Sequence, residues 1–236
     1  MKPTGLPHRP ALHAEKSLIQ AILDGRYPTG STLPAERELA AALGVTRPTL
    51  REALQRLHRD GWISIRHGKG TVVNDYWAHG GLNVLSALVR HGKRLPDDFI
   101  RNLLEVRTAL APAYARAAVD RSPAQVLACL EEAPQLALTA AGFARFDWSL
   151  HRSLAAASGN PIHSLILNGF AGFYEEVAGL YFAHAEGRRL SQSFYAALAR
   201  AARLAAARQA ERVTRDAMEE SAGLWRRVER RLARQP

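Results

Sequence analysis

The spacing of apolar residues changes twice within the first third of the chain, and this constrains the fold more than any other feature. Apolar residues recur at helical spacing over residues 12–25, 34–44 and 47–60, and each segment ends at or beside a glycine. Two β-rich runs then follow, residues 62–66 and 71–73, around the four residues His67-Gly68-Lys69-Gly70. A glycine-containing turn between two such runs predicts a β-hairpin.

Three short helices and a hairpin are the layout of a winged helix-turn-helix domain. Two short helices joined by a tight turn bury little surface alone, so the remaining helix and the hairpin must complete a small core. Thr46 is the expected N-cap of the helix that begins at Arg47. One face of that helix is then free to enter the major groove of DNA.

The rest of the chain, from Asn83 onward, carries helical spacing and no strand signal. We expect about seven helices there, including one over residues 160–184 whose apolar circumference predicts a path through the domain centre. The predicted fold is mainly α. It has a winged helix-turn-helix domain at residues 1–75, a linker at 76–82 and an all-helical domain at 83–236.

Composition narrows the class of protein. The 236 residues carry a net charge of +10 and only one cysteine, Cys129, which excludes an internal disulfide framework. No apolar stretch approaches the ~20 residues needed to cross a bilayer, and the N-terminus does not read as a secretory signal. Residues 47–69 hold six basic and two acidic side chains. We therefore expect a cytoplasmic protein, without membrane association, that binds an anionic partner.

The sequence of the first domain resembles that of the GntR family of bacterial transcription regulators, because particular residue types stand at the same spacing. The resemblance rests on three runs of sequence, Leu33-Pro34-Ala35-Glu36-Arg37-Glu38-Leu39, Gly44-Val45-Thr46-Arg47 and Thr49-Leu50-Arg51-Glu52-Ala53-Leu54. Later runs, Arg59-Asp60-Gly61-Trp62, Gly81-Leu82-Asn83 and Ala157-Ser158-Gly159-Asn160-Pro161-Ile162, resemble the branch of that family that regulates fatty acid metabolism. This branch implies a homodimer on double-stranded operator DNA. It also implies repression of degradation genes, activation of unsaturated fatty acid synthesis genes, and release from DNA by long-chain acyl-CoA.

Chemistry and resemblance agree on the residues expected to contact DNA. An arginine near the start of a recognition helix can form two hydrogen bonds with guanine, whereas hydroxyls and backbone amides suit phosphates. The predicted DNA-binding residues are Arg37, Arg47, Thr49, Arg51, His67, Gly68 and Lys69. Glu36 and Glu52 are interpreted as groups that orient arginines. The chain departs from the family pattern at Pro48 and at Gly70.

The resemblance also assigns an acyl-CoA site in the helical domain. The matching residues are Arg107, Tyr174, Tyr181, Glu220, Ser221, Trp225 and Arg230. Arg107 and Arg230 could pair with phosphate or with an orienting carboxylate, and Trp225 offers a flat wall to adenine or the pantetheine arm. Ala217-Met218 stands where the family pattern has Tyr-Gly, and Met218 fills space that a glycine would leave to a ligand.

The helical domain permits two other interpretations. The metal-dependent branch of the family is typified by an Asp-x-x-x-His motif followed by two later histidines. Asp147 and His151 match the first half of this pattern, but no histidine follows residue 184. We therefore expect no metal and interpret this couple as a buried polar pair. The alternative effector is a different small carboxylic acid. No nucleophile elbow or phosphate loop is present, so we expect no catalytic residues and no cofactor.

Overall fold

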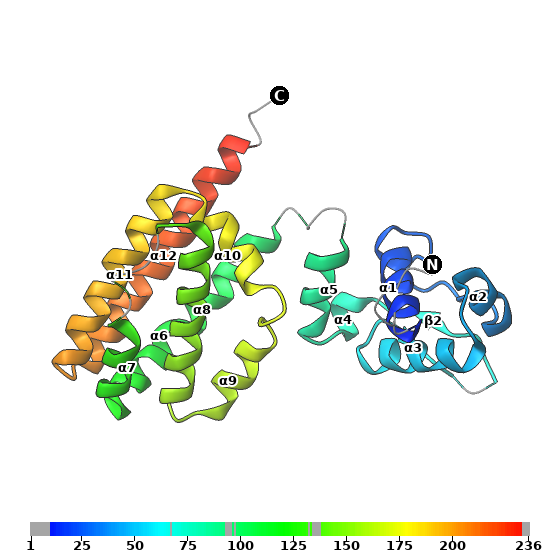
Figure 1. The fold of residues 1–236 in the computed structure, drawn as a ribbon, viewed down its shortest axis with the longest axis horizontal. Helices are drawn as coiled ribbons and strands as arrows, with labels where there is room; N and C mark the ends of the chain where they lie inside the picture. The colour runs from blue at the N-terminus through cyan, green and yellow to red at the C-terminus, as the bar shows by residue number, and fades with distance from the viewer. Residues whose placement is uncertain are drawn as a thin grey trace, which may run out of the picture. The chain divides into compact units, whose positions relative to one another are not determined.

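The computed structural model describes residues 10–66, 68–92, 96, 98–131, 133 and 138–232, with the side chains of 231 and 232 left out. The chain divides into two compact units, residues 1–95 and 96–236. Figure 1 shows the helices of each unit in the colour order of the chain.

The first unit contains the elements that the sequence predicts, in the predicted order. Three helices, α1 (Pro10–Leu23), α2 (Glu36–Leu43) and α3 (Arg47–Arg59), are followed by the antiparallel strands β1 (Ile63–Ser64) and β2 (Val72–Val73). Ile63 pairs with Val73 in the strand register, and Ser64 pairs with Val72. The winged helix-turn-helix prediction is confirmed.

Capping groups fix the tight turn between α2 and α3. Gly44 ends α2 with a left-handed φ of 65°, a conformation that glycine adopts without steric cost. The Thr46 side chain accepts a hydrogen bond from the Thr49 N–H and begins α3, as predicted. The apolar face of α3 packs on α1, and the buried Trp62 closes the core beside the hairpin. This core leaves the first turn of α3 exposed to solvent.

The first compact unit continues past the predicted domain end at residue 75. The predicted linker, residues 76–82, contains a single helical turn, α4 (Tyr76–His79), because the Asp75 side chain accepts a hydrogen bond from the Trp77 N–H. The Tyr76 ring lies 4.9 Å from that of Trp62. The next helix, α5 (Asn83–His91), contacts α1. These contacts, which sequence spacing does not reveal, draw α5 into the first unit.

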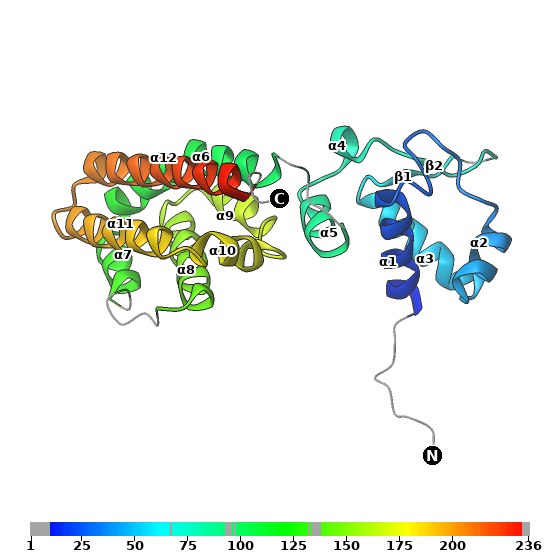
Figure 2. The ribbon, with the colours of Figure 1, turned by 90° about the horizontal axis from the view of Figure 1, so that it is seen from above.

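The second unit is a helical bundle throughout its described residues. Its helices are α6 (Phe99–Arg121), α7 (Pro123–Leu130), α8 (Ala140–Ala157), α9 (Pro161–Asn168), α10 (Tyr174–Phe182), α11 (Ala185–Arg203) and α12 (Ala207–Leu232). Figure 2 shows the two longest, α6 and α12, running side by side, with α11 next to α12. Their facing side chains bury a single apolar core with those of α8 and α10. None of the helices in the described segments is long and apolar enough to span a membrane.

The single helix predicted over residues 160–184 is wrong. The structure divides this stretch into α9 and α10, which are separated by turns over residues 169–173. Backbone hydrogen bonds of the short i to i+3 type from Gly169, Phe170 and Phe173 end the α-helical ladder there. The apolar period continues through the break because the turn also faces the core, where Phe173 is buried. The break places the Phe170 and Phe173 rings beside the cavity described below.

Candidate functional site

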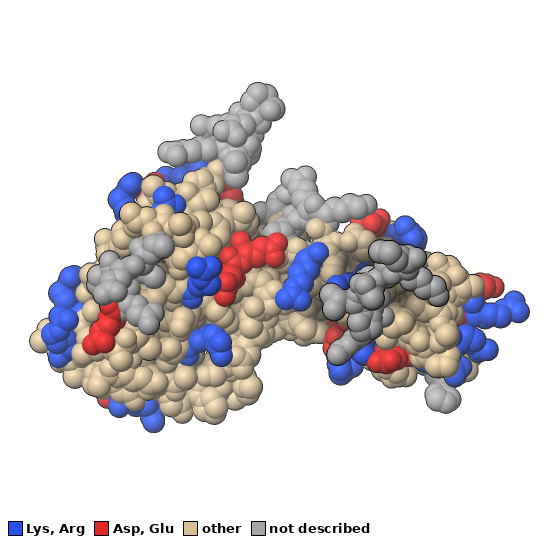
Figure 3. Space-filling model, viewed as in Figure 1, with Lys and Arg blue, Asp and Glu red and all other residues tan. Residues whose placement is uncertain are grey.

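The first candidate site is the exposed surface of α2 and of the first turns of α3. Arg37 on α2 and both Arg47 and Arg51 on α3 are exposed. Figure 3 shows Lys and Arg side chains over the end of the first unit where α2 lies. Exposed arginines at the start of a helix have the charge and reach to meet the phosphates and base edges of duplex DNA.

Glu36 holds two of these arginines in place. Its Oε2 accepts a hydrogen bond from Arg51 Nε at 2.8 Å and lies 3.9 Å from Arg47 Nη2. Glu52 accepts from Arg56, whose other guanidinium nitrogen donates to Glu15 at 3.2 Å. Glu36 and Glu52 therefore both pair with arginines, in line with their interpretation as orienting groups. Arg56 is tied to the protein and is not a free cation.

Thr49 and Pro48 complete the first turn of α3. The Thr49 hydroxyl lies 2.8 Å from that of Thr46, so the two hydroxyls share a hydrogen bond at the helix start. Pro48 stands in the first helical turn, where a missing N–H removes no intrahelical bond. The departure at Pro48 therefore leaves the helix intact.

The hairpin tip carries the remaining predicted DNA-binding residues. Gly68 has a left-handed φ of 70°, and Lys69 is exposed. His67 lies outside the described residues. At the other departure, Gly70, a Cβ atom would come within 2.3 Å of Thr32 Cγ2, so a side chain at this position would force Thr32 to move.

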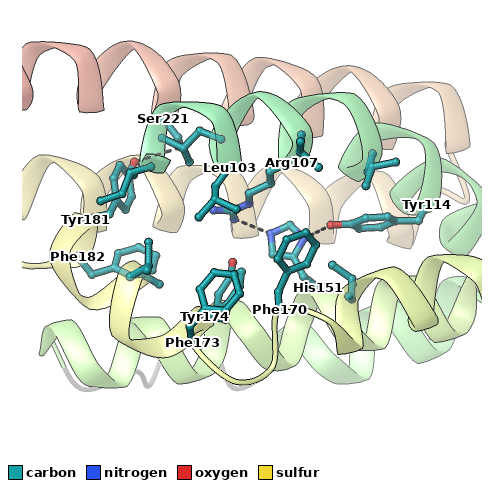
Figure 4. Close-up of a pocket in the computed structure, with 17 residues that line it drawn as sticks. Leu103, Arg107, Tyr114, His151, Phe170, Phe173, Tyr174, Tyr181, Phe182 and Ser221 are labelled. Atoms are coloured by element: carbon teal, nitrogen blue, oxygen red, sulfur yellow. Dashed lines mark hydrogen bonds between the residues drawn. The ribbon is translucent and has the colours of Figure 1, made fainter. Parts of the chain in front are cut away.

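The second candidate site is an apolar cavity of about 90 Å³ inside the helical bundle. Four of the predicted effector residues line it, Arg107, Tyr174, Tyr181 and Ser221, and so do the apolar side chains Leu103, Leu110, Phe170, Phe173 and Phe182. In Figure 4, Tyr181 and Ser221 stand at one end, Tyr114 at the other, and Arg107 with His151 between them. The Tyr181 hydroxyl donates to Ser221 Oγ at 3.1 Å.

The other three predicted effector residues do not line this cavity. Glu220 and Arg230 are exposed on α12, where Arg230 Nε donates to the Arg226 carbonyl. Trp225 is buried, and its indole N–H donates to Glu229 Oε1 at 2.6 Å. The Met218 side chain is also buried, as part of the helical core rather than of the cavity wall.

A charged network lies at the inner wall of the cavity. Arg107 Nη2 donates to Asp147 Oδ2 at 2.7 Å and to His151 Nε2 at 2.6 Å. Because a guanidinium has no acceptor, His151 Nε2 must present its lone pair. The ring is then neutral with its proton on Nδ1, which donates to the Tyr114 hydroxyl at 2.7 Å. Arg107 therefore pairs with a carboxylate, one of the two partners that the sequence leaves open.

Two tyrosine hydroxyls complete the network around Asp147. Tyr174 donates to Oδ2 at 2.6 Å and Tyr195 donates to Oδ1 at 2.9 Å. Asp147 and His151 are almost fully buried, which confirms the buried polar pair, whereas the Arg107 side chain keeps 19% of its surface exposed. Sequence reasoning missed Tyr114 and Tyr195. Their apolar helix faces gave no sign that each hydroxyl would meet a charged partner.

Burial and charge set the protonation states of this network. Burial alone would raise the pKa of Asp147, but Arg107, His151 and the two tyrosine hydroxyls together hold it below its usual value. Burial lowers the pKa of His151 to about 3, and repulsion from Arg107 acts in the same direction. Burial also raises the pKa of Tyr174 well above its usual value. At neutral pH the network therefore holds one positive and one negative charge.

These contacts also bear on metal binding. Within the described residues, no group of three or more His, Cys, Asp and Glu side chains could hold a metal ion. Asp147 and His151 each accept a hydrogen bond from the Arg107 guanidinium. In the described part of the chain, Arg107 Nε is buried and finds no hydrogen-bond acceptor.

Family models match both parts of the chain. The family model described as "Bacterial regulatory proteins, gntR family" matches residues 10–73, and "FadR C-terminal domain" matches residues 74–236. A "Fatty acid metabolism regulator protein" from Edwardsiella ictaluri is 48% identical over 219 residues, which are 92% of this chain and 90% of the relative. The protein of the same name from Klebsiella pneumoniae is 43% identical over 223 residues, 94% of this chain and 93% of that relative.

Likeness to solved structures supports the same fold. A structure described as "Lar controls the expression of the Listeria monocytogenes agr system and mediates virulence" has a TM-score of 0.56 at 19% identity. The match covers 94% of this chain and 97% of that one. The chain is a transcription regulator and belongs to the GntR family. Within the family it is a FadR-type regulator of fatty acid metabolism.

Proposed function

We propose that this protein acts in the cytoplasm as a homodimer on operator DNA and leaves the DNA when a long-chain acyl-CoA enters the α6–α10 cavity. It represses genes of fatty acid degradation and activates genes of unsaturated fatty acid synthesis. The observation that supports the effector is the cavity itself. It is apolar along most of its wall, but the guanidinium of Arg107 and four hydroxyl-bearing side chains, Tyr114, Tyr174, Tyr181 and Ser221, also line it.

The DNA-binding half of the proposal rests on the residues of α2, α3 and the wing. Arg47 and Arg51 would read base edges, and Arg37 and Lys69 would meet phosphates, with His67 reaching the minor groove from the wing tip. Thr49 and the Gly68 backbone would fix the register of the helix and the wing. The ion pairs from Glu36 hold the arginines near the helix start before DNA arrives, so less side-chain freedom is lost on binding.

The acyl chain and the coenzyme would occupy different places. The chain would lie among the aromatic side chains of α10 and of the turn before it, with Tyr181 and Ser221 at the entrance. Glu220 precedes Ser221 on α12, Trp225 and Arg230 follow it, and all three lie outside the cavity. In this proposal they would serve the coenzyme rather than the chain. Arg107 is held by Asp147, and its Nε–H can donate to the thioester carbonyl.

The size of the cavity links ligand binding to a change of shape. A volume of about 90 Å³ is small beside the roughly 300–1,000 Å³ of ordinary ligand pockets. We therefore expect α10 and the turn before it to move away from α6 when the chain enters. An effector that binds only this opened state shifts the population toward it. By thermodynamic reciprocity, operator DNA must weaken acyl-CoA binding by the same factor.

The test uses DNA selected from a random pool by the full-length protein, in mobility-shift titrations at one stated salt concentration. Oleoyl-CoA is expected to lower operator affinity at least tenfold, and coenzyme A alone is expected to have no effect. Leu103→Trp, which fills the cavity, should bind the operator normally and ignore oleoyl-CoA. Leu165→Trp, on the exposed face of α9, is the matched control and should respond as wild type. Unchanged operator affinity in oleoyl-CoA would remove the proposed effector.

One observation favours the alternative effector, a different small carboxylic acid. The resting volume of about 90 Å³ suits a small molecule better than a long chain, and Arg107, which lines the cavity, could pair with a carboxylate. The same titrations decide between the two, with short-chain free acids beside oleoyl-CoA. Release by a free acid, without release by oleoyl-CoA, would favour the alternative.

A further inference from the structure

The second unit has another hollow, of about 540 Å³, on the outside of α8. One face of α8 forms its floor, with Arg145, Ser149, Arg152, Ser153 and Ala156 at successive turns. The opposite walls are polar as well, and they are formed by Gln125 of α7, Ser164 and Asn168 of α9, and Glu175 of α10. The hollow is distinct from the effector cavity, although the Leu167 side chain lines both.

Two guanidinium groups in this hollow have no anionic partner. Arg145 and Arg152 are exposed, and within the described part of the chain neither makes an ion pair with a carboxylate. Other exposed arginines of this unit, such as Arg116, Arg215 and Arg227, each pair with a glutamate. Two unneutralised cations beside three serine hydroxyls are suited to an anion with several acceptor oxygens.

The packing beneath the hollow fixes one of these arginines. The Arg152 guanidinium lies 5.7 Å from the centre of the Trp148 ring, a cation–π distance. Trp148 is itself held by the Tyr174 ring at 4.6 Å on the inner side of α8. Arg152 thus lies against a packed aromatic ring, and this contact lowers the entropic cost of binding a ligand. Among the described residues it has no carboxylate partner.

We propose that this hollow binds the phosphate group of a small organic phosphate. Arg145 and Arg152 lie seven residues apart, about 10 Å along a helix, and their long side chains can converge on one phosphate above Ser149. Glu175 stands at the opposite wall, where its carboxylate would repel a second anionic group but accept a hydrogen bond from a hydroxyl. The preferred ligand is therefore a phosphate monoester that carries hydroxyl groups.

Isothermal titration of the full-length protein at fixed ionic strength tests the proposal, with ribose 5-phosphate and inorganic phosphate as probes. Ribose 5-phosphate is expected to bind saturably with one site per chain. Arg145→Gln and Arg152→Gln should each weaken it at least tenfold, because each removes charge-assisted hydrogen bonds to the phosphate. Arg189→Gln, which removes an exposed charge from α11 outside the hollow, is the matched control and should leave binding unchanged.

Each outcome decides a part of the proposal. If both probes bind equally, the phosphate group alone is recognised; tighter binding of ribose 5-phosphate assigns a role to its hydroxyl groups. Absence of saturable binding overturns the site. Equal weakening by all three variants also overturns it, because attraction to the net positive charge would then explain the binding. Thermal melts of the variants, expected to match wild type, confirm that the hollow is intact.

Discussion

Asp147 provides the sharpest test of the buried network. In Asp147→Asn the side chain keeps its shape but loses its charge, while the Arg107 guanidinium remains inside the bundle. Arg107 then has no anionic partner, and the hydroxyls of Tyr174 and Tyr195 lose a charged acceptor. Removal of one member of a buried ion pair costs about 3–5 kcal/mol because the other charge is left uncompensated.

The cost is measured by urea unfolding followed by helical circular dichroism. We expect a loss of about 3–5 kcal/mol in the free energy of unfolding, which corresponds to roughly 6–20 °C in the melting temperature. Glu211→Gln is the matched control. Its Oε2 lies 3.2 Å from Arg116 Nη1, but the Arg116 side chain is half exposed, so we expect the free energy of unfolding to fall by less than about 1 kcal/mol.

A second variant separates charge from packing. Arg107→Met combined with Asp147→Asn removes both charges, and we expect it to be more stable than Asp147→Asn alone by about 1–3 kcal/mol. An Asp147→Asn protein within 1 kcal/mol of wild type would refute the reasoning. So would a double variant whose loss equals the sum of the two single losses, because the pair would then be uncoupled.

Three further outcomes follow from the structure. Folding stability should fall as pH drops from about 6.5 toward 3, because in this range His151 takes up a proton in the unfolded chain but not in the folded protein. We expect urea titrations to show a loss of about 2 kcal/mol in the free energy of unfolding by pH 5. An equal loss in a His151→Phe variant would contradict this cause. Arg37→Gln, at a residue proposed to meet phosphate, should weaken operator binding and reduce its salt dependence by about one released counterion, whereas Arg59→Gln, whose side chain pairs with Asp60, should change neither in a salt series of mobility shifts. Thr46→Ala should destabilise the first unit by about 1 kcal/mol and speed amide exchange at the start of α3; unchanged exchange at Thr49 would count against the cap.

Local signals predicted the first unit closely because its boundaries are set by local chemistry. Gly44 and Thr46 mark the turn between α2 and α3, and both act in the structure as their residue types indicate. The break after Asn168 also has a local signal, the turn dipeptide Asn168-Gly169, but the apolar spacing passes through it and concealed it. The buried Phe173 anchors the turn against the bundle.

The candidate effector site was predictable in part. Arg107, Tyr174, Tyr181 and Ser221 converge on the cavity, although they come from three helices far apart in sequence. Their convergence follows from family resemblance and not from spacing. The hydroxyls of Tyr114 and Tyr195, by contrast, enter the network through contacts between helices, which one sequence alone does not encode. The same applies to the placement of Trp225 outside the cavity.

The small resting volume of the effector cavity has a kinetic consequence. A ligand much larger than the available space must wait for the helices to part, so the rate of capture is governed by a motion of the protein rather than by diffusional encounter. In stopped-flow mixing, the observed rate should therefore level off as ligand concentration rises, and the plateau would report how often the bundle opens unaided.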